Sequence, residues 1–491
     1  MMSLPTWLRA VLQCLANLAQ DKKVNMAGRL GVISLASFAA TSLRICRPIP
    51  AVRTARNAFG STKPLNGASS QGGSSIELMK CFSVQSEHAV FAPPISLEDH
   101  AGTRNRAKMT SDVGMDVENK QLIVSLKGGL RQAFPFVWLR DNCQCPVCFH
   151  PTAMSRKTYA YELNVDITAK SVEMSPDSNG VIIHWEDGHK SHFTFHWLRA
   201  YCFIDSKQDQ YLDPKFDFWG ADIDLQSFNF DEVLKNDGAL YNWLTELVSR
   251  GIAVVTNAPS KVGQLHSLGG RVAFLRPSNY GPTFQVKSKV DPNHVAYTSG
   301  ALSLHTDMAY YIRQPGIQML HCIDQAEGTG GENLFSDGFK VAMDLKEDDP
   351  EAFRLLSTIP FEFSDVGTDY YGSFHQYSRH PTIRLDERGE VVSVTLSDHS
   401  RDPMLRAPLH QVQPLYRALN KYCNMLLDPQ NVFKYKMEKG DIMTFNNRRA
   451  LHGRSSFRVT QAGGRHLEGG YLEWDEVNSR LRVLAAQLNS K

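Results

Sequence analysis

The sequence predicts a mainly β fold with flanking helices: a large sandwich or barrel domain over residues 215–485, preceded by a small β-rich domain over residues 115–205. Many short apolar runs separated by Gly, Asp and Asn turns fill the second half of the chain, and helical patterning is confined to a few segments. The chain has 491 residues, of which 42% are hydrophobic. This is enough apolar material for roughly two to four domains.

The small domain is predicted from two groups of strand-like sequence. Residues 121–126 form an apolar run, and Gly128 and Gly129 follow as a turn signal. Residues 180–185 and 191–195 flank a short polar turn, a pattern typical of a β-hairpin.

The larger domain begins with a predicted helix over residues 230–250, in which apolar residues recur at helical spacing and which Gly251 ends. The apolar run at residues 252–255 then predicts a buried strand. Further strands are predicted at residues 316–322, 391–396 and 441–445.

Residues 1–110 are predicted to be an extension with its own composition. Its first 76 residues hold nine Lys and Arg residues against one acidic residue, Asp21. Such a basic, acid-poor segment is typical of an organelle transit peptide, and equally of a disordered extension or of sequence before an internal start. Residues 63–75 have the composition of a linker. The apolar run at 30–40 is too short for a membrane span, which needs about 20 residues.

The charge and the cysteine content limit the function classes. The whole chain carries a net charge of +2, but the residues after position 76 hold 44 basic and 50 acidic side chains, a net charge of −6. Nucleic-acid binding is therefore not expected, because it requires a basic face. Nine cysteines in so long a chain are too few for a disulfide scaffold, which favours a reducing compartment.

Three of these cysteines, Cys143, Cys145 and Cys148, lie within six residues and predict a zinc site. Zinc requires a fourth ligand, for which His150 and His189 are the candidates. We favour His189, because it lies at the predicted hairpin turn and would join two loops of a small domain through one ion. A site with four protein ligands is structural. The alternative is three buried cysteines without a metal.

A second metal site is predicted in the larger domain. Residues 302–307 alternate as in a strand, so His305 and Asp307 are expected on one face. Together with His452, they would form a two-histidine, one-carboxylate set that leaves positions on Fe(II) for substrate and dioxygen. Arg465 could hold the far carboxylate of a 2-oxo acid bound there. The alternatives are a hydrogen-bonded histidine at a strand end and an arginine in a structural ion pair.

Three motifs then show a resemblance to a known family. The sequences WLRDNCQCPVC at 138–148, AYTSG at 296–300 with HTD at 305–307, and RHLEG at 465–469 closely resemble the gamma-butyrobetaine dioxygenase family. The resemblance covers roughly residues 115–485 and implies a double-stranded β-helix (jelly-roll) oxygenase domain behind a small zinc domain, working as a homodimer. It implies the zinc ligands Cys143, Cys145, Cys148 and His189, the iron ligands His305, Asp307 and His452, and Arg465 as the 2-oxoglutarate ligand.

The resemblance also implies an aromatic box for a trimethylammonium group, formed by Tyr280, Phe284, Tyr297 and Tyr471. Three positions depart from the family. Phe284 stands where Trp is typical, His294 where Asn is typical, and Asp398 lies in a loop where a neutral Asn would suit a substrate carboxylate. A Phe ring is a weaker partner for a cation than a Trp ring.

The expected activity is hydroxylation of gamma-butyrobetaine to L-carnitine, with 2-oxoglutarate and dioxygen consumed, succinate and carbon dioxide formed, and ascorbate as reductant. The alternatives are trimethyllysine dioxygenase, whose branch the EGTGG sequence at 327–331 resembles equally, and a non-catalytic zinc-binding interaction protein. The extension favours a mitochondrial location, and the family resemblance favours the cytoplasm.

Overall fold

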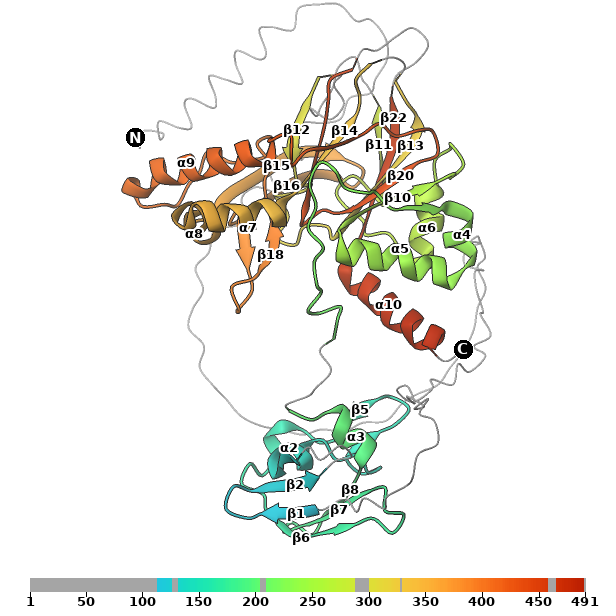
Figure 1. Cartoon of the computed structure of the whole chain (residues 1–491), viewed down its shortest axis with the longest axis vertical. Helices are drawn as coiled ribbons and strands as arrows, with labels where there is room; N and C mark the ends of the chain where they lie inside the picture. The colour runs from blue at the N-terminus through green and yellow to red at the C-terminus, as the bar shows by residue number, and fades with distance from the viewer. Residues whose placement is uncertain are drawn as a thin grey trace, which may run out of the picture. The chain divides into compact units, whose positions relative to one another are not determined.

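The computed structural model describes residues 113–125, 131–203, 209–287, 300–326, 329–457 and 465–489 (Figure 1). The predicted transit peptide or extension over residues 1–110 lies outside the described residues. The small domain and the large domain are described separately below.

The small domain contains two three-stranded antiparallel sheets, ordered β1-β2-β3 and β6-β7-β8. Their strands are β1 (Val113–Asp116), β2 (Gln121–Ser125), β3 (Arg131–Pro135), β6 (Ala169–Met174), β7 (Gly180–Trp185) and β8 (Lys190–Thr194). The other elements are α2 (Phe136–Asp141), the short pair β4 (Phe149–His150) and β5 (Ser155–Arg156), the 3-10 helix η1 (Ala160–Glu162) and α3 (Phe195–Ala200). The predicted hairpin is β7–β8, and its buried Trp185 and Phe193 pack with Phe134 and Phe136 in the domain core.

The large domain is built on two sheets. The six-stranded sheet has the order β11-β22-β13-β20-β10-β9 and the four-stranded sheet the order β12-β21-β14-β19. The strands of the first are β11 (Thr283–Lys287), β22 (His466–Leu472), β13 (Ile317–Asp324), β20 (Ile442–Asn446), β10 (Ile252–Thr256) and β9 (Ser227–Asn229). Those of the second are β12 (Leu302–His305), β21 (Ala450–Arg454), β14 (Asn333–Asp337) and β19 (Phe433–Tyr435).

Strand β10 shows how this sandwich is packed. Ile252 and Val254 belong to the apolar core shared with Phe335 of the four-stranded sheet, whereas Ala253 and Val255 pack with the helices on the other face. Because both faces are covered, all four positions are apolar and buried. The predicted fold, a β-rich sandwich with flanking helices that follows a small β-rich domain in the sequence, is confirmed.

Helices cover the sheets on two sides (Figure 1). One group, packed on the outer face of the six-stranded sheet, comprises α4 (Phe230–Lys235), α5 (Asp237–Ser249), α6 (Gln264–Val272) and α10 (Trp474–Asn489). The other comprises α7 (Gly338–Asp348), α8 (Pro350–Thr358) and α9 (Leu409–Leu426). The single helix predicted over residues 230–250 is wrong, because extended Asn236 divides it. The Asn236 side chain instead caps α5 by accepting hydrogen bonds from the amides of Gly238 and Ala239.

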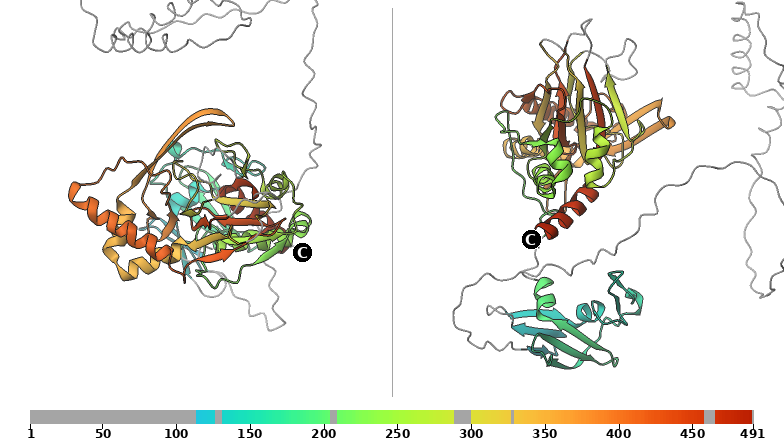
Figure 2. Two further views of the ribbon diagram at one scale, coloured as in Figure 1. Left: turned by 90° about the horizontal axis from the view of Figure 1, so that it is seen from above. Right: turned by 90° about the vertical axis from the view of Figure 1, so that its right-hand side faces the viewer.

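Two further strand pairs join the second helix group. They are β15 (Phe361–Asp369) with β16 (Gly372–His380), and β17 (Ile383–Leu385) with β18 (Val391–Val394). Strands β15 and β16 form a long curved ribbon that extends away from the two sheets (Figure 2).

A buried ion pair fixes the start of β21 to the end of β14. The Arg449 guanidinium is fully buried, and its Nε and Nη2 atoms lie 3.0 and 2.8 Å from the two carboxylate oxygens of Asp337. Asp337 also caps α7 by accepting from the Phe339 and Lys340 amides. The remaining donors of Arg449 bind the carbonyl oxygens of Ser249 and of the Asp217 backbone. Every charge in this network is therefore paired.

Replacing Arg449 with Met is expected to lower the free energy of unfolding of the large domain by about 3–5 kcal/mol, because the Asp337 carboxylate would stay buried without its partner. A denaturant titration followed by circular dichroism measures this loss. Arg354→Met is the matched control, since Arg354 and Glu351 form an exposed ion pair and its loss should cost less than about 1 kcal/mol. Equal losses in the two variants would contradict the assignment.

Candidate active site and zinc-type cluster

Strand pairing brings the two predicted iron-binding histidines together. Strands β12 and β21 are antiparallel neighbours, and His305 lies directly opposite His452 in their register. The prediction that Asp307 lies on the strand is wrong. Strand β12 ends at His305, and Asp307 lies in the loop that follows. The convergence therefore comes from a strand end and its loop, and not from strand alternation.

The three side chains form a group that could hold one metal ion. The Oδ1 atom of Asp307 lies 3.3 Å from His305 Nε2 and 3.6 Å from His452 Nε2, and the two imidazole centroids are 4.2 Å apart. The candidate ligand atoms all lie within 4.8 Å of one another. Two histidines and one carboxylate are the donor set that non-haem Fe(II) oxygenases use.

Other groups orient these ligands. The Nδ1 atom of His305 is 2.8 Å from the carbonyl oxygen of Ser303, which leaves Nε2 facing Asp307. The Asn447 side chain accepts a hydrogen bond from the Asp307 amide and donates one to its carbonyl oxygen, at 2.7 and 3.0 Å. Tyr471 donates its phenolic proton to the second carboxylate oxygen of Asp307, at 2.7 Å. Sequence reasoning missed Asn447, for which the only signal is its position five residues before His452.

The pKa values of Asp307 and His452 are shifted in the directions that favour binding of a metal cation. Burial alone would raise the pKa of Asp307, but hydrogen bonds to its carboxylate, from His305 first and also from Tyr471, help to outweigh burial and lower the pKa. Burial, together with repulsion from His305, lowers the pKa of His452 to about 3. Asp307 is thus ionised and His452 neutral, and these are the protonation states of metal ligands.

Arg465 lines one cavity with His305, Asp307 and His452. It is a buried cation that has no ion-pair partner among the described residues. Its side chain is 5% exposed, and among the described residues no carboxylate lies within ion-pair distance of it. One terminal nitrogen donates to the Asn333 side chain at 2.6 Å, and Nε has no hydrogen-bond partner there. Burial and the neighbouring Arg454 lower the pKa of Arg465 to about 10. A buried cation without a counter-charge is costly, so the site suits an anionic ligand such as a 2-oxo diacid.

Three of the four predicted box residues line this cavity of about 270 Å³. The Phe284 ring lies 5.5 Å from the Tyr471 ring and 6.1 Å from the Tyr280 ring, measured between centroids. The Phe284 ring also lies directly over Gly469, where any Cβ atom would collide with it. Tyr297 lies outside the described residues.

The structure describes two of the three positions at which the sequence departs from the family's typical residues, Asp398 and Phe284. Asp398 is not among the described residues that line the cavity, and its carboxylate pairs with Arg401 at 3.2 Å. The charge of Asp398 is therefore offset by that of Arg401. Phe284 does line the cavity. His294 lies outside the described residues.

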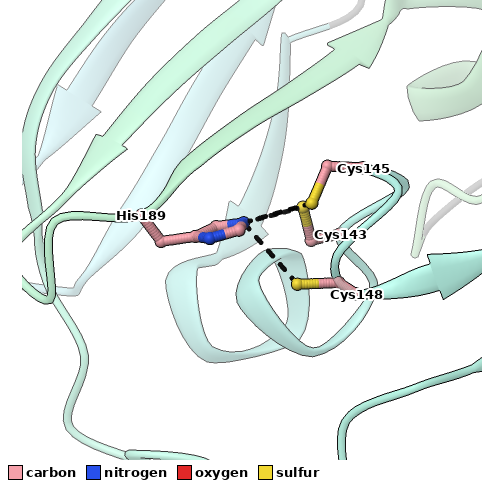
Figure 3. Close-up of side chains that lie close together, drawn as sticks. All are labelled: Cys143, Cys145, Cys148 and His189. Carbon is pink, nitrogen blue, oxygen red and sulfur yellow. Dashed lines mark hydrogen bonds between the residues drawn. The ribbon is translucent and has the colours of Figure 1, made fainter.

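The small domain brings its predicted zinc ligands together (Figure 3). The sulfur atoms of Cys143, Cys145 and Cys148 lie 3.3, 3.5 and 3.6 Å from Nε2 of His189. His150 is turned elsewhere, and its Nδ1 atom contacts Thr152 and the amide of residue 153 instead. Three thiols around one imidazole suit a tetrahedral zinc ion with no open position.

The class of the protein follows from the large domain. Residues 208–471 match the family described as "Taurine catabolism dioxygenase TauD, TfdA family". The protein is therefore a 2-oxoglutarate-dependent dioxygenase, a class that uses Fe(II). The chain belongs to the TauD/TfdA family, and residues 113–199 match the model "Gamma-butyrobetaine hydroxylase-like, N-terminal".

Curated relatives extend over both domains. The chain is 40% identical to "Gamma-butyrobetaine dioxygenase" of Homo sapiens, over 73% of this chain and 92% of that protein. It is 33% identical to the protein of the same name from Pseudomonas sp., over 74% and 93%. It is 30% identical to "Trimethyllysine dioxygenase, mitochondrial" of Homo sapiens, over 72% and 83%. Within the described part of the chain, no helix has the length and apolar character needed to span a bilayer.

Replacing His189 with Ala is expected to remove most of the bound zinc, about one ion per chain, because three thiolates alone leave the tetrahedron incomplete. Zinc content after purification, measured by plasma mass spectrometry, tests this. His150→Ala is the control and should keep its zinc. If His150→Ala loses zinc and His189→Ala does not, the fourth ligand has been misassigned.

Proposed function

We propose that the protein hydroxylates gamma-butyrobetaine to L-carnitine, consuming 2-oxoglutarate and dioxygen and releasing succinate and carbon dioxide. The observation that carries the proposal is the cavity itself. An aromatic wall of Tyr280, Phe284 and Tyr471 adjoins the His305–Asp307–His452 group in one cavity of about 270 Å³. A quaternary ammonium group suits such a wall, since it cannot donate a hydrogen bond and is bound by aromatic faces.

In this proposal His305, Asp307 and His452 hold the Fe(II) ion, and Arg465 binds the far carboxylate of 2-oxoglutarate. With Fe(II) and 2-oxoglutarate bound, dioxygen would be the oxidant: one oxygen atom would enter the substrate C–H bond and the other succinate, as 2-oxoglutarate loses carbon dioxide. The protein contributes position and an environment with little water. Arg465 can bind the far carboxylate of 2-oxoglutarate because its Nε has no hydrogen-bond partner among the described residues and its side chain is nearly fully buried.

Tyr471 links the substrate wall to the iron site. Its ring stacks with Phe284 at an interplanar angle of 28°, while its hydroxyl is held by Asp307. The ring orientation is therefore fixed by the carboxylate that binds the metal. A substrate bound on these rings lies in the same cavity as the metal ligands, as selective hydroxylation requires.

Trimethyllysine is the second candidate substrate, because it carries the same cation and because a trimethyllysine dioxygenase is among the relatives. The higher identity to gamma-butyrobetaine dioxygenases and the matching N-terminal domain favour gamma-butyrobetaine. Ascorbate as reductant and assembly as a homodimer belong to the same proposal.

Purified protein supplied with Fe(II), 2-oxoglutarate and gamma-butyrobetaine should form a product with one added oxygen, detected by mass spectrometry. His305→Ala and Asp307→Ala should abolish substrate-dependent succinate formation, because each removes a ligand of the metal. His410→Ala, at an exposed position of α9, is the control and should keep activity. Activity retained in both ligand variants would refute the assignment. Turnover of trimethyllysine alone would select the second candidate.

Phe284→Trp is expected to lower the KM for gamma-butyrobetaine about threefold, because an indole face attracts a cation more strongly than a phenyl face. The Phe284 ring already occupies the space over Gly469, so the second ring of an indole has to extend into the cavity that Phe284 lines. Steady-state kinetics measures the change, and an unaltered KM for 2-oxoglutarate serves as the control. A KM for gamma-butyrobetaine that stays the same or rises would argue against cation binding at this ring.

A further inference from the structure

Asp365 places a carboxylate in the wall of the cavity beside the aromatic residues. It lies in β15 of the projecting ribbon, is half-buried, and lines the same cavity as Tyr280 and Phe284. Its Oδ2 atom accepts a hydrogen bond from the Tyr280 hydroxyl at 3.2 Å. The wall thus runs from Asp365 through the three aromatic rings to Asp307, with a carboxylate at each end.

The charge of Asp365 has no counter-charge in the described part of the chain. No Lys, Arg or His there lies within ion-pair distance of Asp365. Two phenols, Tyr280 and Tyr310, lie at its end of the wall. Tyr280 and Tyr310 lie 3.0 Å apart through their hydroxyls, and burial, with the charge of Asp365 adding to it, raises the pKa of both. The acidic Asp365 is therefore available to a cationic ligand.

Packing holds Asp365 in place. Tyr370, the residue after β15, packs against Gly281, which has a φ of +95° and where a Cβ atom would lie 3.1 Å from the Tyr370 ring. Phe374 of β16 packs edge-on to Tyr280 at 6.4 Å between centroids. The Ser364 amide donates to the carbonyl oxygen of Ser400 at 2.8 Å. The ribbon thus carries Asp365 into a fixed position beside the box.

We propose that Asp365 is a specificity-determining residue, which supplies the negative charge that makes the cavity select a trimethylammonium cation over a neutral group of the same shape. This inference rests on the proposed function and deepens it. The aromatic rings alone attract a cation modestly, and they accept an uncharged tert-butyl group almost as well by apolar contact. A full charge in a half-buried wall discriminates between the two more strongly.

The competing interpretation is that Asp365 only orients Tyr280 through their hydrogen bond. Asp365→Asn separates the two, because the Asn carbonyl oxygen can still accept from Tyr280 while the charge is lost. Asp369→Asn is the matched control. It removes the same charge from the same strand, about 13 Å further along it, at a residue that is not among the described residues lining the cavity.

The experiment compares kcat/KM for gamma-butyrobetaine with that for its carbon isostere, in which a tert-butyl group replaces the trimethylammonium group. In Asp365→Asn, we expect the ratio of the two values to fall about tenfold, through a higher KM for the cation and with the isostere unaffected. Asp369→Asn should keep the ratio of the unaltered protein. An unchanged ratio in Asp365→Asn, or an equal loss for both compounds, would overturn the inference.

Calorimetric binding of tetramethylammonium to the unaltered protein and to Asp365→Asn separates this inference from the proposed function. If the unaltered protein oxidises neither compound, the proposed function fails, and the inference is still tested by this titration. About tenfold weaker binding to Asp365→Asn supports it. Equal binding, or no binding to the unaltered protein, overturns it.

Discussion

The pairing of β12 with β21 is the constraint on which the candidate active site depends. It sets His305 opposite His452, and the end of β12 at His305 lets the chain turn so that Asp307 reaches both imidazoles. Neither histidine could adopt this position from a neighbouring register, because a slip of one residue would send the side chain to the other face of the sheet. The buried Arg449–Asp337 pair holds β21 against β14 on its other side, so the register is fixed from both edges.

Two charged side chains that have no ion-pair partner among the described residues indicate which kinds of ligand the cavity could bind. Arg465 is a buried cation without a carboxylate partner, and Asp365 is a carboxylate without a cation partner, in the described part of the chain. Natural proteins pair such groups, unless a ligand does so. The two side chains line one cavity together with His305, Asp307 and His452. In the proposed function, Arg465 would bind the anionic co-substrate and Asp365 the cationic end of the substrate, so each charge would find its partner in a ligand.

Most of the fold could be predicted from local patterns, and the failures have physical reasons. The hairpin β7–β8 and the buried strand β10 follow from apolar periodicity and turn residues, which act within a few positions. Apolar spacing predicts one helix across Asn236 because the spacing continues on both sides of it. The division into α4 and α5 is seen only in the extended backbone of Asn236 and in the capping of α5 by its side chain. Asp307 was placed on a strand because alternation over six residues does not show where pairing stops.

Within the site, residue identity predicted the groups that could hold a metal ion, which the structure brings together, but not the groups that orient them. Histidine, cysteine and aspartate at close spacing indicate a metal because few other roles gather them. Asn447 and Asp365 carry no such signal, since an amide or a carboxylate in a loop or strand is ordinarily a surface group. Their roles arise from contacts between segments far apart in the sequence, as between Asn447 and Asp307 and between Asp365 and Tyr280. The proposed selection of the substrate by charge would thus be a property of the assembled wall, because the rings come from β11, its preceding loop and β22, whereas the carboxylate comes from the ribbon.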